Sequence, residues 1–188
     1  YKLGESLFIF PGLIILIANG VFVLPFIIFA GLAGQLADKY ENTIIIKLVK
    51  IFELLIIGIA IYGFYYNSII ILLFTIFLMG SHSTFFGPIK YSILPDHLKK
   101  EELLEANGYI EAGTFLAIFV GTLTGGLYTN FSDLVIYVML ATGVIGLGAS
   151  FYIPKSARFN SNLQINHNIY EEIFHILHFA RSKKIVYL

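Results

Sequence analysis

The sequence predicts an all-α membrane protein, because long apolar stretches alternate with short polar connectors along most of the chain. Hydrophobic residues make up 57% of the 188 residues, and the mean hydropathy is +0.82. Soluble domains are usually about 45–50% apolar. Each stretch holds about 20 residues or more, which is enough for a helix to cross a bilayer core. The predicted spans are about 12–37, 44–66, 68–87, 108–128 and 134–153.

The distribution of cations predicts the orientation of these spans. The formal net charge is zero, but all twelve Lys and Arg residues except Lys2 lie in or beside the connectors after the first, third and fifth stretches. The connectors at 65–68 and 129–133 contain none. Basic connectors are preferentially cytoplasmic, so we expect 65–68 and 129–133 to lie outside.

The composition also excludes several function classes. The chain has no Cys, which excludes disulfides, Cys-ligated metals and thiol chemistry. Its five His residues form no metal-ligand spacing, so we expect no metal and no cofactor. The charge balance gives no basic field for nucleic acid. The first stretch is too long for a signal peptide, and no cleavage site follows it.

The first two spans carry local signals of their own. We place the first helix at about 12–37, with Pro25 inside it, because neighbouring helices can satisfy the backbone groups that a proline frees. The second span ends at the aromatic pair 65–66, which suits the headgroup level. The turn at 67–68 is so short that the second and third spans must be antiparallel neighbours.

The third and fourth spans are joined by a polar connector. The third span ends in a small and polar run at 80–84, and the connector follows at 87–98. Asp96 is expected to cap the helix that begins in the charged segment 99–105, because a short acceptor precedes a helical run.

The fourth and fifth spans are rich in glycine. Gly121, Gly125 and Gly126 form a G-x-x-x-G pattern, which predicts that two helices approach closely. The fifth span carries Gly143, Gly146 and Gly148.

The segment 154–188 is expected to be a cytoplasmic linker. Apolar residues at helical spacing predict an amphipathic surface helix within it, and its last residues resemble the first turn of another span. We expect both chain ends to be cuts in a larger protein.

The segment after the first span reads Gly34-Gln-Leu-Ala-Asp38-Lys39. It resembles the first half of the loop motif G-x-L-A-D-R-x-G-R-K of the major facilitator superfamily. The resemblance implies that Asp38 stabilises one conformation at the cytoplasmic gate, with Gly34 and Lys39 as parts of the same motif. An acid near a helix N-terminus would also gain from the helix dipole. The chain departs from the motif at 41–43, where the basic half is absent.

Two further segments, 86–96 and 104–114, closely resemble the lysophospholipid transporter branch of that superfamily. They contain P-I-K-Y-S-I-L, then A-N-G, then E-A-G-T, with Ser92 in place of the usual Gly. The resemblance implies a partial N-terminal six-helix half of a major facilitator bundle. The first helix and the C-terminal half of the same protein would then be its missing partners.

The same resemblance implies a function. The protein would move a lysophospholipid, chiefly lysophosphatidylethanolamine, inward across a bacterial inner membrane for re-acylation, in contact with membrane lipid. The branch contains free transporters and fusions with acyltransferase and acyl-activating domains. No acyltransferase motif is visible here, so we do not expect this chain to be an enzyme. The alternatives are a facilitator-type transporter of another solute or drug, or the membrane portion of a fused acyltransferase.

The candidate cavity residues lie on the third and fourth spans. Asn107, Glu111 and Thr114 share one helix face. Lys90 is the nearest expected partner of Glu111, because the third span ends beside the start of the fourth. Glu111 would either serve transport or form a structural ion pair. Lys90 could instead bind a lipid phosphate or extend to the headgroups.

His82 and Glu53 complete the set of polar residues within the spans. His82 either lines a pore or packs through a hydrogen bond, and packing is the favoured interpretation. Glu53 follows Lys47 and Lys50 at three-residue steps. That spacing favours a stripe of interfacial charge over a transport site.

Overall fold

The computed structural model describes residues 11–127, 132–156, 163, 165 and 178. Every long regular element among them is a helix. These helices are α2 (Pro11–Lys39), α3 (Asn42–Tyr65), α4 (Ile69–Ser92), α5 (Leu94–His97), α6 (Leu103–Gly126) and α7 (Ser132–Ser150). The amphipathic helix and the next span that we expected between 154 and 188 lie outside the described residues, except for a few single positions.

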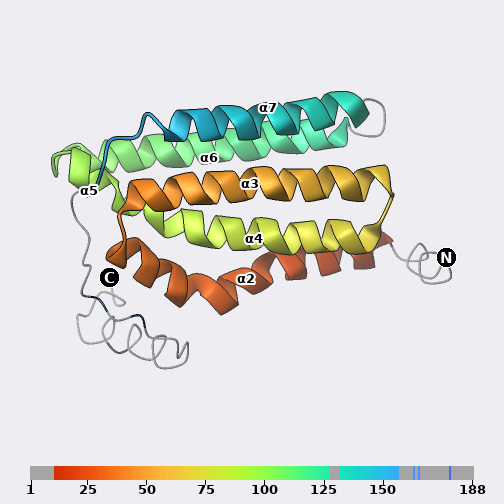
Figure 1. The fold of residues 1–188 in the computed structure, drawn as a ribbon, viewed down its shortest axis with the longest axis horizontal. Helices are drawn as coiled ribbons and strands as arrows, with labels where there is room; N and C mark the ends of the chain where they lie inside the picture. The colour runs from red at the N-terminus through yellow and green to blue at the C-terminus, as the bar shows by residue number, and fades with distance from the viewer. Residues whose placement is uncertain (1–10, 128–131, 157–162, 164, 166–177, 179–188) are drawn as a thin grey trace.

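The five long helices lie alongside one another and alternate in direction (Figure 1). The connectors that follow α2 and α4 and the segment after α7 gather at one end of the molecule, whereas the α3–α4 turn lies at the other end. The long helices coincide with the five apolar stretches, although α4 and α6 extend several residues further toward the polar connector between them. The all-α fold class is therefore confirmed.

Four of the helical segments are long and apolar enough to cross a membrane: Gly12–Lys39, Ile69–His97, Leu103–Gly126 and Asp133–Ser150. They confirm that the protein has several helices suited to a bilayer. Helix α3 runs antiparallel to α4 over a similar length but carries Lys47, Lys50 and Glu53 in its first half. That α3 also spans the membrane stays a prediction.

The α3–α4 connection is a very short turn. Asn67 adopts a left-handed conformation, with φ at 49°. Its N–H donates to the carbonyl of Phe64, and the N–H of Ser68 donates to the carbonyl of Gly63, at 3.1 and 3.0 Å. This is the Schellman arrangement, in which Asn is tolerated because its side chain suits left-handed backbone. The turn therefore satisfies two carbonyls that the end of α3 would otherwise leave free.

Helices α2 and α4 make a close contact where Gly80 faces α2. A Cβ atom at Gly80 would lie only 2.3 Å from the backbone oxygen of Phe22 and 3.2 Å from Pro25 Cγ. Pro25 is buried inside α2, where it removes one helical hydrogen bond, and α2 is visibly bent (Figure 1). The absent side chain of Gly80 thus allows the two backbones to meet.

The predicted polar run at the end of the third span is largely buried. Ser81, His82 and Thr84 each have less than a tenth of their surface exposed. The two hydroxyl groups donate to the carbonyls of Phe77 and Gly80 within the same helix, at 3.0 and 2.8 Å. Burial of these hydroxyls therefore leaves no donor unpaired, and His82 remains the polar group of this run that needs a partner elsewhere.

Helix α6 has no buried residue. A Cβ atom added at Gly121, Gly125 or Gly126 would meet no heavy atom of the described chain within 4 Å. The described part of the molecule therefore does not form the predicted close helix contact at this G-x-x-x-G pattern, and the contact stays a prediction. Glycines of α7 make such contacts instead, because Gly143 lies against Leu54 and Ile57 of α3.

Candidate functional site

The two sequence motifs meet at the end of the bundle where the polar connectors gather. Ala37, from the end of α2, forms a buried cluster with Ile46 of α3, Ile89 of α4 and Ile93. Phe86 and Ile153 pack against this cluster. Residues from segments far apart in the sequence thus form one small apolar core at the predicted cytoplasmic end.

Hydrogen bonds tie the segment after α7 to the same end. Thr43 Oγ1 donates to the carbonyl of Pro154 at 3.0 Å, and Ser156 donates to the carboxylate of Asp96. Asp96 lies in the short helix α5. The prediction that Asp96 caps the following helix is wrong, because α6 begins only at Leu103 and Asp96 is used to hold the segment after α7.

The three residues of the gating motif lie in the last two turns of α2. Asp38 is exposed and makes no hydrogen bond or ion pair among the described residues. Asp38 sits at the C-terminal end of α2, where the dipole of its own helix is negative, so a gain from a helix N-terminus would have to come from another helix and stays a prediction. Lys39 lies with its Nζ 5.6 Å from the centre of the Tyr40 ring, and Gly34 has no atom near its Cβ position.

The ends of α4 and α6 meet through two hydrogen bonds. Lys90 Nζ donates to Thr114 Oγ1 at 3.2 Å, and Tyr91 Oη donates to the carboxylate of Glu111. The predicted Lys90–Glu111 ion pair is therefore not formed in this structure. Lys90 lies instead 4.7 Å from the centre of the Tyr91 ring. The side chain of Asn107 donates to the carbonyl of Leu103 in its own helix and takes no part in this contact.

Lys90 also borders an apolar pocket of about 240 Å³ at the same end of the bundle. Its other polar lining residue is His97, on α5. The apolar lining residues are Ile46, Phe86, Ile93, Leu94, Ile110 and Ile153. A cation beside an apolar pocket is suited to an amphipathic ligand with an anionic group.

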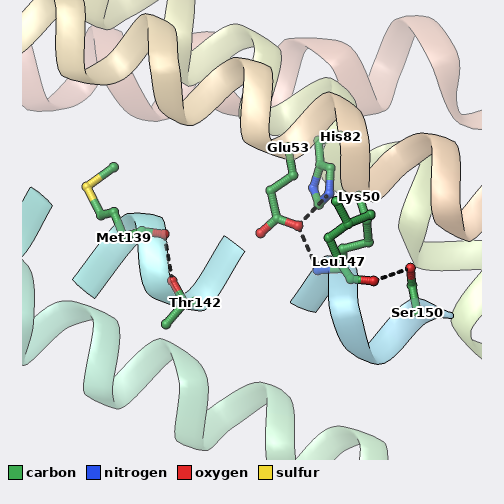
Figure 2. A network of polar contacts seen from close by, with 7 residues as sticks. All are labelled: Lys50, Glu53, His82, Met139, Thr142, Leu147 and Ser150. Carbon is green, nitrogen blue, oxygen red and sulfur yellow. Dashed lines mark hydrogen bonds and ion pairs between the residues drawn. The ribbon is translucent and has the colours of Figure 1, made fainter. Parts of the chain in front are cut away.

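A second polar site lies between α3, α4 and α7 (Figure 2). Lys50 Nζ lies 2.6 Å from Glu53 Oε2, and His82 Nε2 lies 3.5 Å from that same oxygen. At this distance His82 Nε2 has no completed hydrogen bond to Glu53. We therefore treat it as an electrostatic contact. About a fifth of the Lys50 and Glu53 side chains is exposed, so the pair is substantially withdrawn from solvent.

Aromatic and small residues enclose this polar site. The Phe86 ring stacks on the His82 ring, with centres 5.9 Å apart, and Lys50 Nζ lies 5.2 Å from the centre of Phe86. A Cβ atom at Gly146 of α7 would lie 3.3 Å from Lys50 Nζ. The sequence did not place Glu53 beside His82, because the 28 residues between them give no information on which helix faces meet.

The bundle of long apolar helices, with charged groups at one end and between helices, defines a multi-pass membrane protein. The sequence matches the Major Facilitator Superfamily over residues 6–185. Because this match covers most of the chain, the protein belongs to that superfamily.

Curated relatives give a more detailed comparison. Lysophospholipid transporter LplT of Escherichia fergusonii is 33% identical over 138 residues, which are 73% of this chain and 33% of that protein. The LplT of Escherichia coli O1:K1 / APEC is 35% identical over 138 residues, with the same coverage. The LplT of Photorhabdus laumondii is 30% identical over 137 residues, covering 72% of this chain and 33% of the relative. The chain thus spans about a third of the length of these relatives. No solved structure matches the chain.

Proposed function

We propose that this chain is part of a transporter that moves lysophospholipid inward across a bacterial inner membrane, where the lipid is re-acylated. The proposal of a lipid substrate rests on the position of Lys90 at the edge of an apolar pocket. A lysophospholipid has a phosphate that a lysine can bind and a single acyl chain that apolar residues can cover. The named relatives support the same substrate class.

Transport would require that the two halves of a complete bundle rock about a central site. In this proposal the α4–α6 contact at Lys90 and Glu111 belongs to the cytoplasmic end of the substrate path. The substrate would reach Lys90 after its headgroup has crossed, and His97 would lie beside it on α5. Asp38 and Lys39, at the end of α2, would act in the conformational change and not in substrate binding.

Uptake by the reconstituted full-length protein tests the proposal. We expect proteoliposomes to take up labelled lysophosphatidylethanolamine, and Lys90→Gln to lower uptake about tenfold, because a charge-assisted hydrogen bond to phosphate contributes about 1.5–3 kcal/mol. Lys100→Gln is the matched control, since Lys100 is an exposed lysine outside the pocket. If proteoliposomes with the wild-type protein take up another solute and no lysolipid, the result would support the alternative facilitator-type transporter. Lysolipid acylation without translocation would support the fused acyltransferase.

The proposed orientation places Lys99 in the cytoplasm and the Asn67 turn outside. It rests on the cation asymmetry and on the position of the two connectors at opposite ends of the bundle. The chain has no Cys, so Asn67→Cys and Lys99→Cys can each be labelled with an impermeant thiol reagent in a full-length protein whose other cysteines, where present, are replaced by Ser. We expect intact cells to label Asn67→Cys and only permeabilised cells to label Lys99→Cys. The reverse pattern would invert the topology.

A further inference from the structure

His82 is a buried titratable residue that transport at Lys90 does not use. Only 7% of its surface is exposed, and among the described residues its Nε2 atom has no hydrogen-bond partner. Buried polar atoms are nearly always paired, so an unpaired ring nitrogen requires an explanation. The nearest polar atom that could satisfy it is Glu53 Oε2, at 3.5 Å.

A proton on Nε2 decides whether this contact is favourable. A neutral ring with its lone pair on Nε2 faces the carboxylate with like polarity. A ring with a proton on Nε2 can donate to the same carboxylate oxygen, either as the neutral Nε2–H tautomer or, with the added attraction of a full charge, as the imidazolium. The observed distance between His82 Nε2 and Glu53 Oε2 is 3.5 Å. It is short enough for electrostatic attraction but too long for a completed hydrogen bond.

Glu53 Oε2 already has a second partner. Lys50 Nζ holds this oxygen at 2.6 Å from one turn earlier on α3. A protonated His82 would place two cations on one carboxylate in a site of low dielectric, so the imidazolium competes with Lys50 for that oxygen. In this same position Lys50 Nζ also lies 5.2 Å from the centre of the Phe86 ring and 3.3 Å from a Cβ position at Gly146, so these contacts would remain near Lys50 if it moved away from the carboxylate.

The other helices that pack here bring no competing charge to the site within their described residues. The charged residues of α2 are Asp38 and Lys39, both in its last turn. The titratable residues of α7 are Asp133 and Tyr137, which lie toward the end opposite Gly146. On α4 itself, Lys90 lies two turns beyond His82 and donates to Thr114. The site therefore consists of His82, Glu53 and Lys50.

We propose that His82 and Glu53 form a proton-binding site between α3 and α4. The proton adds to His82 Nε2 from water, the imidazolium then donates to Glu53 Oε2, and Lys50 loosens its hold on that oxygen. The bound proton replaces an ion pair within α3 by one that joins α3 to α4. Because α7 packs against the same place, the proton changes how these three helices are held together.

Nuclear magnetic resonance of the full-length protein in lipid nanodiscs tests this site without any transport measurement. Histidine is labelled with ¹⁵N, and the His82 signal is identified as the one lost in His82→Gln. Spectra are recorded between about pH 5 and pH 8, the range in which histidine serves as a switch, and we expect them to contain the imidazolium form of His82 hydrogen-bonded to Glu53. If His82→Gln does not fold, His82→Asn identifies the signal instead.

Substitutions of Glu53 and Lys50 should change the proton affinity of His82 in opposite directions. Glu53→Gln removes the anion that favours the proton, and we expect proton affinity to fall at least about tenfold. Lys50→Met leaves Glu53 without its competing cation, so proton affinity should rise. Glu105→Gln and Lys100→Met are matched controls, because each removes a like charge at an exposed position.

A His82 ring that stays neutral with a proton fixed on Nε2 across this range would overturn the proposal and make the contact a structural hydrogen bond. A transition that Glu53→Gln leaves in place would overturn it as well.

Discussion

Helices α4 and α6 have the same length of 24 residues, and both carry small residues, yet they pack in opposite ways. Helix α4 buries Gly80 against the backbone of α2 and His82 against α3. Helix α6 leaves its glycines open and joins α4 only through side chains at their polar ends. Among the described residues, a small residue thus forms part of a close helix contact on α4 and not on α6.

The difference arises from what faces each glycine. Gly80 lies opposite a segment of α2 that is bent and contains Pro25. There is no room for a Cβ atom at Gly80, so any side chain there would push the backbones of α2 and α4 apart. Gly121 has open space around its Cβ position within the described residues. The same residue type thus determines packing on one helix and has no packing role in the described part of the other.

The largest expected effect comes from an added methyl group at these two glycines. We expect Gly80→Ala to lower the stability of the full-length protein by about 2–3 kcal/mol, because the new Cβ atom collides with the Phe22 carbonyl oxygen. Gly121→Ala should change stability by less than about 1 kcal/mol, with a small gain from helix propensity. Thermal unfolding in detergent measures both.

Gly143→Ala provides an intermediate case, since its Cβ atom would meet the ends of Leu54 and Ile57 side chains, which can move. A severe loss with Gly121→Ala would show that a segment beyond the described residues packs on α6. An unaffected Gly80→Ala would contradict the close α2–α4 contact.

The second effect concerns the only hydrogen bonds between α4 and α6 in the described chain. We expect a double-mutant cycle between Lys90→Met and Thr114→Val to give a coupling energy of about 1 kcal/mol in stability, as for a hydrogen bond to a charged group. Tyr91→Phe and Glu111→Gln should couple in the same way. In a double-mutant cycle between Lys90→Met and Glu111→Gln, the two stability changes should be nearly additive. Strong coupling between them would instead support the ion pair expected from the sequence.

The smallest effect on stability is expected at the end of α2. Asp38 is exposed and without a partner among the described residues, so Asp38→Asn should leave thermal stability within about 0.5 kcal/mol of the wild type. We expect lysolipid uptake to slow about fivefold, which corresponds to about 1 kcal/mol in a conformational equilibrium. Equal uptake rates in wild type and variant, at matched protein amounts, would remove Asp38 from the gate.

The helices themselves could be predicted from the sequence because they depend on length and apolarity. The stretch 44–66 became α3 at Asn42–Tyr65, and the short turn after it forced α4 to run back beside it. The end of α4 was predicted too early. The predicted span ended at 87, whereas the helix continues through Pro88 to Ser92. A proline within a long helix can be accommodated when the freed carbonyl finds other partners.

The site was less predictable, because it depends on helix rotation. Lys90 and Glu111 were expected to pair from their shared end of the bundle, yet Thr114 and Tyr91 intervene. Glu53 was interpreted as interfacial from its neighbours on α3, whereas its partner His82 lies on the next helix. The direction in which a side chain points around a helix axis depends on packing with other helices, and one sequence gives little information on that packing.

The Asn67 turn has a consequence for how the protein enters its membrane. Helices α3 and α4 are joined by a turn that begins and ends within about three residues and leaves no slack. Lys50 and Glu53 would oppose the insertion of α3 by itself, whereas α4 brings His82 and Phe86 to cover them. If α3 spans the membrane as predicted, we therefore expect α3 and α4 to enter the bilayer together as one helical hairpin.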